Sequence, residues 1–224
     1  MGEHDGHRAR LRKRFLDHGL ENFADHEVLE LLLCFCIPRV DVNPLAHRLI
    51  DQFGGLEEVL CAPAEELGQV KGVGEQAVTL LRLIYPAYHK ARFSGNSRPQ
   101  ILNSTAKAGN YLLSLFAGVR EERMYQLCLD AKGKLLQCRL LSAGTVDAVA
   151  LSARQVAETA LRTRASAVVL SHNHPSGVAL PSREDMTTTR LAADALRTVD
   201  VQLIDHIIVA DEDFVSMRES GIEW

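Results

Sequence analysis

Residues 166–186 read SAVVLSHNHPSGVALPSREDM. The apolar and mostly β-branched segment 167–170 predicts a buried strand. The strand leads directly into His172 and His174, which lie two residues apart and therefore project to the same side of an extended chain. The stretch thus predicts a strand that brings two imidazoles together at its end.

A loop with two prolines and a glycine follows, over residues 175–181. A loop of this length can return Asp185, at the expected start of a helix, to His172 and His174. Two imidazoles and one carboxylate form a zinc ligand set, and three protein ligands leave the fourth tetrahedral position to water, as in catalytic sites. The stretch therefore predicts a catalytic zinc site.

The same residues also have a simpler explanation. The pattern His-x-His is common by itself, and Ser182 followed by Asp185 matches a capping box at the start of a helix. The two explanations are compatible, because a ligand in the first helical turn is held rigidly. A cap leaves unexplained why an apolar strand ends in two histidines, so we favour the metal site.

The spacing of His172-x-His174, seven residues, Ser182, two residues and Asp185 is similar to the JAMM motif of the JAB/MPN metalloprotease superfamily. The wording HNHPSG followed by PSRED resembles the RadC family more narrowly. The resemblance implies zinc on both histidines and Asp185, Ser182 as an oxyanion stabiliser, and an upstream glutamate as general acid and base. Asn173 stands where deubiquitinating relatives usually carry Ser or Thr, which weakens ubiquitin as the substrate.

Two glutamates are candidates for the upstream acid and base. A zinc hydrolase needs a group that takes a proton from water and returns it to the leaving nitrogen. Glu121 and Glu122 both precede a strand predicted over residues 124–129. Comparing the end of this strand, Leu-Asp130, with the family's pattern favours Glu122. The alternative is that both are solvated charges at a strand edge.

Composition limits the class of protein. The 224 residues are 46% hydrophobic with a net charge of −4, so a core can be buried and a strongly basic nucleic-acid binder is not indicated. No apolar run is long enough to cross a bilayer, and no export signal is recognisable. The five cysteines are odd in number and suit reduced core thiols. We therefore expect a cytoplasmic protein.

The N-terminal half is predicted to be helical. Residues 8–92 resemble the N-terminal region of the RadC family, and Lys71, Gly72 and Gly74 lie in a turn like that of a helix-hairpin-helix, whose amides face a DNA phosphate. Glu75 and four nearby glutamates oppose phosphate binding. We expect these three residues to contact nucleic acid weakly, if at all.

A Ser-, Gly-, Asn- and Pro-rich linker over residues 91–102 divides the chain. We expect an all-helical domain with the helix-hairpin-helix-like motif over residues 1–95, then a JAB/MPN-like domain over residues 102–224. Alternating strands and helices make the fold class α/β (α+β), a mixed sheet packed with helices. His206, in a strand predicted over residues 201–209, is expected away from the motif as a core histidine, the alternative being a partner of a metal ligand.

The expected function is that of a zinc-dependent metallohydrolase, a metallopeptidase or isopeptidase whose peptide or protein substrate is not identified. The alternative is a DNA-associated repair or recombination accessory protein whose metal site is structural or idle. A phosphodiesterase that uses the same metal is a third hypothesis. A weak DNA contact through the helical domain is compatible with each of these functions, and no membrane is expected as a partner.

Overall fold

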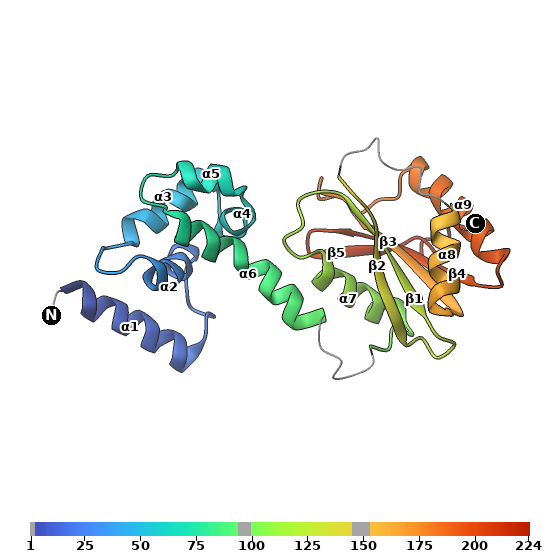
Figure 1. Ribbon diagram of the computed structural model, residues 1–224, viewed down its shortest axis with the longest axis horizontal. Coiled ribbons are helices and arrows are strands. Elements are labelled where there is room, and N and C mark those ends of the chain that lie inside the picture. Colours follow the sequence, from blue (N-terminus) through green and yellow to red (C-terminus); the bar gives the residue numbers. More distant parts are fainter. Residues whose placement is uncertain (1–2, 94–99, 145–152) are drawn as a thin grey trace. The chain divides into compact units, whose positions relative to one another are not determined.

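The structure is a computed structural model that describes residues 3–93, 100–144 and 153–224. The chain divides into two compact units, Met1–Ser94 and Gly95–Trp224 (Figure 1). Within the described residues, the first unit contains helices alone, and the second contains one sheet with its helices. No described helix combines the length and the apolarity that crossing a bilayer requires.

The helical unit is built around a leucine-rich core. Its helices are α1 (Glu3–His18), α2 (Asp25–Cys36), α3 (Asn43–Phe53), α4 (Leu56–Cys61), α5 (Ala64–Gln69) and α6 (Glu75–Phe93). Residues four apart lie on one face of a helix, so Leu29 and Leu33 of α2 point together into the core. Leu49, Leu67 and Leu81 meet them from three other helices.

The turn between α5 and α6 has the expected hairpin form. Gly72 adopts φ +100°, a backbone conformation that side-chain-bearing residues rarely take. Val70 and Val73 are buried on either side of it, while Lys71 and Gly74 are exposed. The two valines therefore anchor the turn to the core and leave its tip at the surface.

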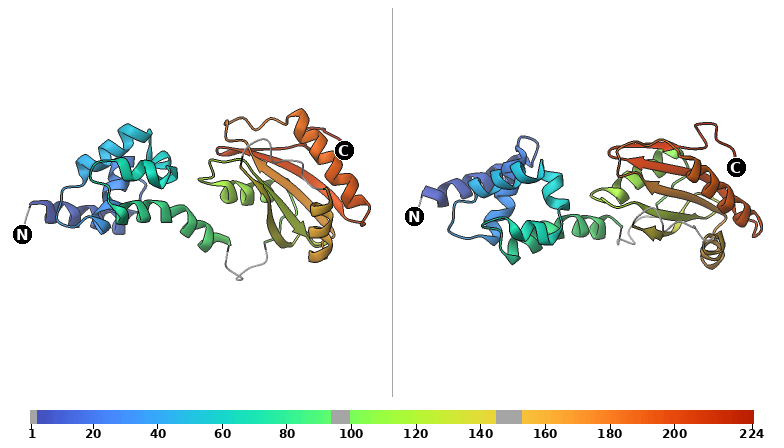
Figure 2. Two further views of the ribbon diagram at one scale, coloured as in Figure 1. Left: turned by 45° about the horizontal axis from the view of Figure 1, so that its top comes forward. Right: turned by 90° about the horizontal axis from the view of Figure 1, so that it is seen from above.

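The second unit is a five-stranded mixed sheet. Its elements are α7 (Thr105–Phe116), β1 (Arg123–Leu129), β2 (Leu135–Ala143), α8 (Ala153–Thr163), β3 (Ala167–Asn173), α9 (Arg183–Arg197), β4 (Gln202–Ala210) and β5 (Asp213–Ser216). The strand order is β2-β1-β3-β4-β5, with β3 and β4 parallel and all other neighbours antiparallel. Helix α7 covers one face, and α8 and α9 cover the other (Figure 2). The predicted α+β class is confirmed.

Strand β3 is the centre of this sheet and is buried along its whole length. Val168 and Leu170 pack into the apolar cluster formed with α8 and α9. His172 is the next residue on that face, because side chains alternate along a strand. The strand therefore places His172 under α9, at the end of the hydrophobic core.

Strand β4 contains one extra residue relative to β3. Val168 pairs with Leu203 and Val169 pairs with Asp205, so Ile204 is left as a bulge. Leu203 and His206 are three residues apart and would face opposite sides of a regular strand. The bulge shifts the alternation, so that Leu203 packs in the cluster with α8 and α9 and His206 also contacts α9.

Candidate metal centre

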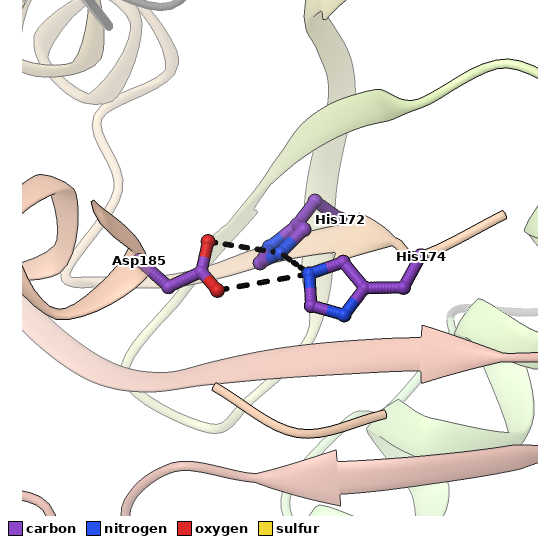
Figure 3. Close-up of side chains that lie close together, drawn as sticks. All are labelled: His172, His174 and Asp185. Carbon is purple, nitrogen blue, oxygen red and sulfur yellow. Dashed lines mark hydrogen bonds and ion pairs between the residues drawn. The ribbon is translucent and has the colours of Figure 1, made fainter. Parts of the chain in front are cut away.

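The side chains of His172, His174 and Asp185 converge at the end of β3 (Figure 3). His172 Nε2 lies 2.8 Å from His174 Nε2 and 3.1 Å from Asp185 Oδ1. His174 Nε2 lies 3.6 Å from Asp185 Oδ2. His172 is completely buried and the other two are largely buried. Within the described residues, this is the group of histidine, cysteine and carboxylate side chains arranged to hold a metal ion.

The spacing of these atoms fits a small divalent cation. Ligands about 2.0–2.1 Å from a tetrahedral zinc ion lie about 3.3 Å from one another. The three separations, between 2.8 and 3.6 Å, bracket that value. Imidazole nitrogen with one carboxylate oxygen is a donor set typical of zinc sites that keep one position open. The residues present therefore fit the metal that the motif implies.

The pKa values of Asp185 and His174 are both shifted by their contacts at the site. Burial disfavours the ionised form of Asp185, but the interactions with His172 and His174 and the hydrogen bond from the Ser182 backbone amide together outweigh burial and lower the pKa of this carboxyl. The hydrogen bond with Asp185 raises the pKa of His174, against burial, and the Val178 carbonyl and the charges of Asp185 and Glu122 add to the rise. The carboxylate is thus negative at neutral pH and faces two nitrogen donors.

The start of α9 holds Asp185 in place. The backbone amide of Ser182 donates to Asp185 Oδ2 at 2.7 Å, and Ser182 Oγ accepts from the amide of Asp185 at 3.1 Å. This reciprocal pair is the predicted capping box, which is confirmed. The Ser182 hydroxyl also donates to Asp185 Oδ2 at 2.7 Å. The cap and the candidate metal site share Asp185, so the two explanations of this residue are compatible.

The loop before α9 orients the second histidine. His174 Nδ1 lies 2.8 Å from the carbonyl of Val178, which can only accept a hydrogen bond. The proton is therefore on Nδ1, and Nε2 keeps its lone pair toward Asp185 and His172. The proline- and glycine-rich segment therefore orients His174, because it places the Val178 carbonyl beside the His174 ring.

Glu121 and Glu122 differ in their surroundings. Glu121 is exposed and forms an ion pair with Arg123. Glu122 is half-buried, and its charge contributes to the raised pKa of His174. The two glutamates immediately precede β1, in which Met124 pairs with His172. The charge of Glu122 thus contributes to the electrostatics of His174 at the candidate metal centre.

Asn173 holds the backbone on both sides of Glu122. Its side-chain oxygen accepts from the Arg123 amide at 2.8 Å, and its side-chain nitrogen donates to the Glu121 carbonyl at 3.1 Å. Asn173 is itself 5% exposed, so its side chain is largely removed from water. Its side chain therefore links the His-x-His strand to Glu122. The sequence comparison identified Asn173 only as a departure from the deubiquitinating enzymes.

His206 lies against the candidate metal centre, although we expected it away from the motif. Its Nε2 is 2.8 Å from His172 Nδ1, and its ring is completely buried. Complete burial lowers the pKa of His206, so the ring is uncharged. The expectation was wrong about distance because the parallel pairing of β3 with β4 is made across α9, far along the chain. His206 is both a hydrogen-bonded core histidine and a partner of a ligand.

The remaining predicted residues lie in the helical unit. Lys71, Gly72 and Gly74 are at the surface in the hairpin turn, and the guanidinium of Arg48 donates to the Lys71 carbonyl at 3.3 Å. Glu75, at the start of α6, is also exposed. A cation and an anion thus stand beside the same turn.

Comparison with known proteins matches the sheet unit to one family. Residues 102–222 match the RadC-like JAB domain, and residues 6–79 match the UPF0758 N-terminal family. The chain belongs to the RadC-like JAB family. The resemblance expected from the motif wording is therefore confirmed, and the family assignment covers more than half of the chain.

Two curated relatives match this RadC-like protein over nearly its full length. A UPF0758 protein of Ruegeria pomeroyi is 38% identical over 215 residues, which are 96% of this chain and 96% of the relative. A UPF0758 protein of Fusobacterium nucleatum is 31% identical over 233 residues, covering 99% of this chain and 100% of the relative. The RadC-like protein and its relatives therefore share both the helical and the JAB regions.

Proposed function

We propose that this RadC-like protein is a zinc-dependent metallohydrolase that cleaves an amide bond in a peptide or isopeptide substrate. The convergence of His172, His174 and Asp185 carries the proposal, since it offers two nitrogen donors and one carboxylate within 4.8 Å of one another. A metal held only for structure is typically enclosed by four protein ligands. The described part of the chain supplies three ligands to this site, which leaves one coordination position for water or substrate.

The three ligands would hold zinc through His172 Nε2, His174 Nε2 and one oxygen of Asp185. A bound zinc ion supplies a Lewis acid for the scissile carbonyl and lowers the pKa of water to about 7. Glu122 takes the proton that the attacking water loses and returns it to the leaving nitrogen. Asn173 supports this role, because it fixes the backbone immediately before and after Glu122.

Ser182 has one hydroxyl proton and two possible tasks. In the structure the hydroxyl donates to Asp185 Oδ2, which orients the carboxylate. To stabilise the tetrahedral oxygen of the substrate, the hydroxyl must turn away from Asp185. The backbone amide of Ser182 donates to the same oxygen and remains there when the hydroxyl turns. The oxyanion role is therefore compatible with a carboxylate that stays in place.

A cleavage screen with controlled metal content tests the proposal. Chelator-treated protein and protein reloaded with one equivalent of zinc are compared on a library of unfolded polypeptides and branched lysine-linked peptides. We expect cleavage only after reloading, and neither zinc retention nor cleavage in His174→Ala. His18→Ala, at an exposed histidine, is the matched control and should behave as wild type. Zinc binding of equal strength in wild type and His174→Ala contradicts the proposed site.

A second candidate function is DNA association through the helical unit. The exposed hairpin at Lys71 and Gly72, beside Arg48, is the observation that favours it. The exposed carboxylate of Glu75 opposes it. Fluorescence anisotropy with duplex DNA at several salt concentrations separates the two functions. Tight binding at physiological salt together with no zinc-dependent cleavage would favour an accessory protein over a hydrolase.

A further inference from the structure

A continuous line of hydrogen bonds runs from His172 to the main chain of α9. His172 Nδ1 lies 2.8 Å from His206 Nε2, and His206 Nδ1 lies 2.6 Å from Thr189 Oγ1. The Thr189 hydroxyl donates to the carbonyl oxygen of Asp185 at 2.5 Å. The side chains of His172, His206 and Thr189 belong to residues with 0% exposure, so water does not complete or compete with these bonds.

The carbonyl oxygen of Asp185, at one end of this line, determines which atom donates in each hydrogen bond. A carbonyl oxygen only accepts, so the single hydroxyl proton of Thr189 is donated to it. The sulfur of Met217, 3.7 Å from the same hydroxyl, is a weaker acceptor and does not compete effectively. Thr189 Oγ1 must then accept from His206, which places a proton on His206 Nδ1.

The same reasoning continues through the two rings. The nitrogens of His206 meet a hydroxyl and an imidazole rather than a carboxylate, so a second proton would bury an uncompensated charge. His206 Nε2 therefore carries a lone pair and accepts from His172, whose proton must be on Nδ1. In neutral His172 this leaves the lone pair on Nε2, the atom that faces His174 and Asp185.

We infer that Thr189 and His206 form a tautomer relay that presents the Nε2 lone pair of His172 to a metal ion. Both are positioning residues, since each acts on the metal through another side chain. The inference rests on the proposed metal site and not on any hydrolytic activity. It assigns a task to two buried polar residues that lie outside the recognised motif.

Two features of the fold make the relay possible. Thr189 follows Asp185 by one helical turn, so its hydroxyl reaches the carbonyl of the residue whose carboxylate faces the site. His206 faces α9 because the bulge at Ile204 shifts the alternation of β4. Asp185 thus contacts the relay at both of its ends: its carboxylate faces His172 Nε2, and its backbone carbonyl accepts from Thr189.

Proton positions on the rings test the inference directly. Long-range nitrogen–proton correlation spectra of uniformly ¹⁵N-labelled protein distinguish the two neutral tautomers and the imidazolium form, with assignments from single histidine substitutions. We expect neutral His206 with its proton on Nδ1, and a proton on Nδ1 of His172, in both metal-free and zinc-loaded protein. His206 found as the Nε2–H tautomer, or as an imidazolium, overturns the relay.

Zinc affinity provides the second test, with a matched pair of variants on α9. Thr189→Val keeps the side-chain shape and removes the hydroxyl, while Thr187→Val removes a hydroxyl that donates to the Arg183 carbonyl in the same way but does not contact His206. Loss of a group that supports a metal ligand typically weakens metal binding by roughly 10–100-fold. We expect that loss in Thr189→Val, recovery in Thr189→Ser, and wild-type affinity in Thr187→Val.

Competition with a chromophoric chelator measures these affinities, and circular dichroism establishes that each variant is folded. Equal zinc affinity in folded Thr189→Val and wild type contradicts the inference. If Thr189→Val does not fold, the ring tautomers of the wild-type protein test the inference by themselves. A protein with the expected tautomers and affinities but no zinc-dependent cleavage refutes the hydrolase and keeps the relay. A protein that shows zinc-dependent cleavage but the opposite tautomers refutes the relay and keeps the hydrolase.

Discussion

The helical unit and the sheet unit bury different kinds of side chain. Of the eleven polar or charged residues that are buried in the described chain, one, Glu30, belongs to the helical unit. The other ten are in the sheet unit: Gln126, Thr159, Ser171, His172, Asn173, Asp185, Thr189, Asp205, His206 and Ser216. Burying a polar group costs free energy unless it is hydrogen-bonded, so this imbalance needs a cause.

The buried glutamate of the helical unit has a structural explanation. Glu30 contacts the ring of His7 at 2.7 Å and accepts from the side-chain nitrogen of Asn43 at 3.0 Å, which joins α2 to α1 and α3. In the sheet unit, four of the ten buried polar residues lie at the candidate metal centre or form hydrogen bonds with its residues, namely His172, Asp185, Thr189 and His206. The sheet unit therefore gathers several of its buried polar residues around one candidate site, whereas Lys71 and Glu75, at the hairpin of the helical unit, are exposed.

The largest expected effect concerns the glutamate at the edge of the buried cluster. Glu122→Gln keeps the size of the side chain and removes its basicity, so hydrolysis should fall by roughly a hundredfold or more while zinc is retained. Steady-state cleavage rates and zinc content per chain measure the two effects. Glu121→Gln, at the adjacent exposed residue paired with Arg123, should change little. A larger loss in Glu121→Gln would mean that the roles are exchanged.

Proton competition should be strong in the sheet unit. Because hydrogen bonding to Asp185 raises the pKa of His174, the ring is protonated at a higher pH than an ordinary histidine, and protonation blocks metal binding. Zinc affinity should be constant above this pKa and fall by up to about tenfold per pH unit below it. Titration calorimetry between pH 5 and pH 8 measures the onset. Since the charge of Glu122 adds to the rise, Glu122→Gln should move the onset to lower pH, and an onset equal to that of Glu121→Gln would contradict this coupling.

A moderate effect is expected at the bridge between β3 and β1. Asn173→Ala leaves the Arg123 amide and the Glu121 carbonyl without their partner, which should lower the free energy of unfolding by about 1–3 kcal/mol. The cleavage rate should fall while zinc affinity stays near wild type, because Asn173 touches the backbone around Glu122 and no ligand. Asn173→Asp keeps the acceptor and loses the donor, so it should be intermediate. Chemical denaturation and kinetics measure both, with exposed Asn110→Ala as the control, and a selective loss of zinc would contradict the assignment.

The smallest effect is expected in the hairpin of the helical unit. Lys71→Ala removes one exposed cation, so any DNA affinity should weaken slightly, and the dependence of log affinity on log salt should drop by about 0.9 or less. Anisotropy titrations at three salt concentrations measure the slope. Tight, salt-resistant DNA binding that Gly74→Pro abolishes would show that the exposed hairpin of this unit is also functional. The contrast between the two units would then no longer separate functional from structural regions.

Local patterns in the sequence determined much of this protein. The apolar strand that ends in His172, the spacing to Asp185 and the capping box at Ser182 are all contained within about twenty residues, so their geometry follows from strand alternation and helix capping. The same kind of local rule predicted the hairpin at Gly72, where a positive φ favours glycine. The mixed α+β class likewise followed from alternating strands and helices.

Only the tertiary structure decided which distant polar residues support the site. His206 lies beside His172 because β3 and β4 are parallel, and it faces α9 only because Ile204 is a bulge. Asn173 reaches both sides of Glu122 because β1 is the antiparallel neighbour of β3. One extra residue in a strand moves every later side chain to the other face, and a sequence pattern with period two does not reveal which residue is the extra one. The sequence therefore revealed the candidate ligands within a single stretch of chain. Strand pairing and register, which depend on packing across the sheet, decided which residues support them.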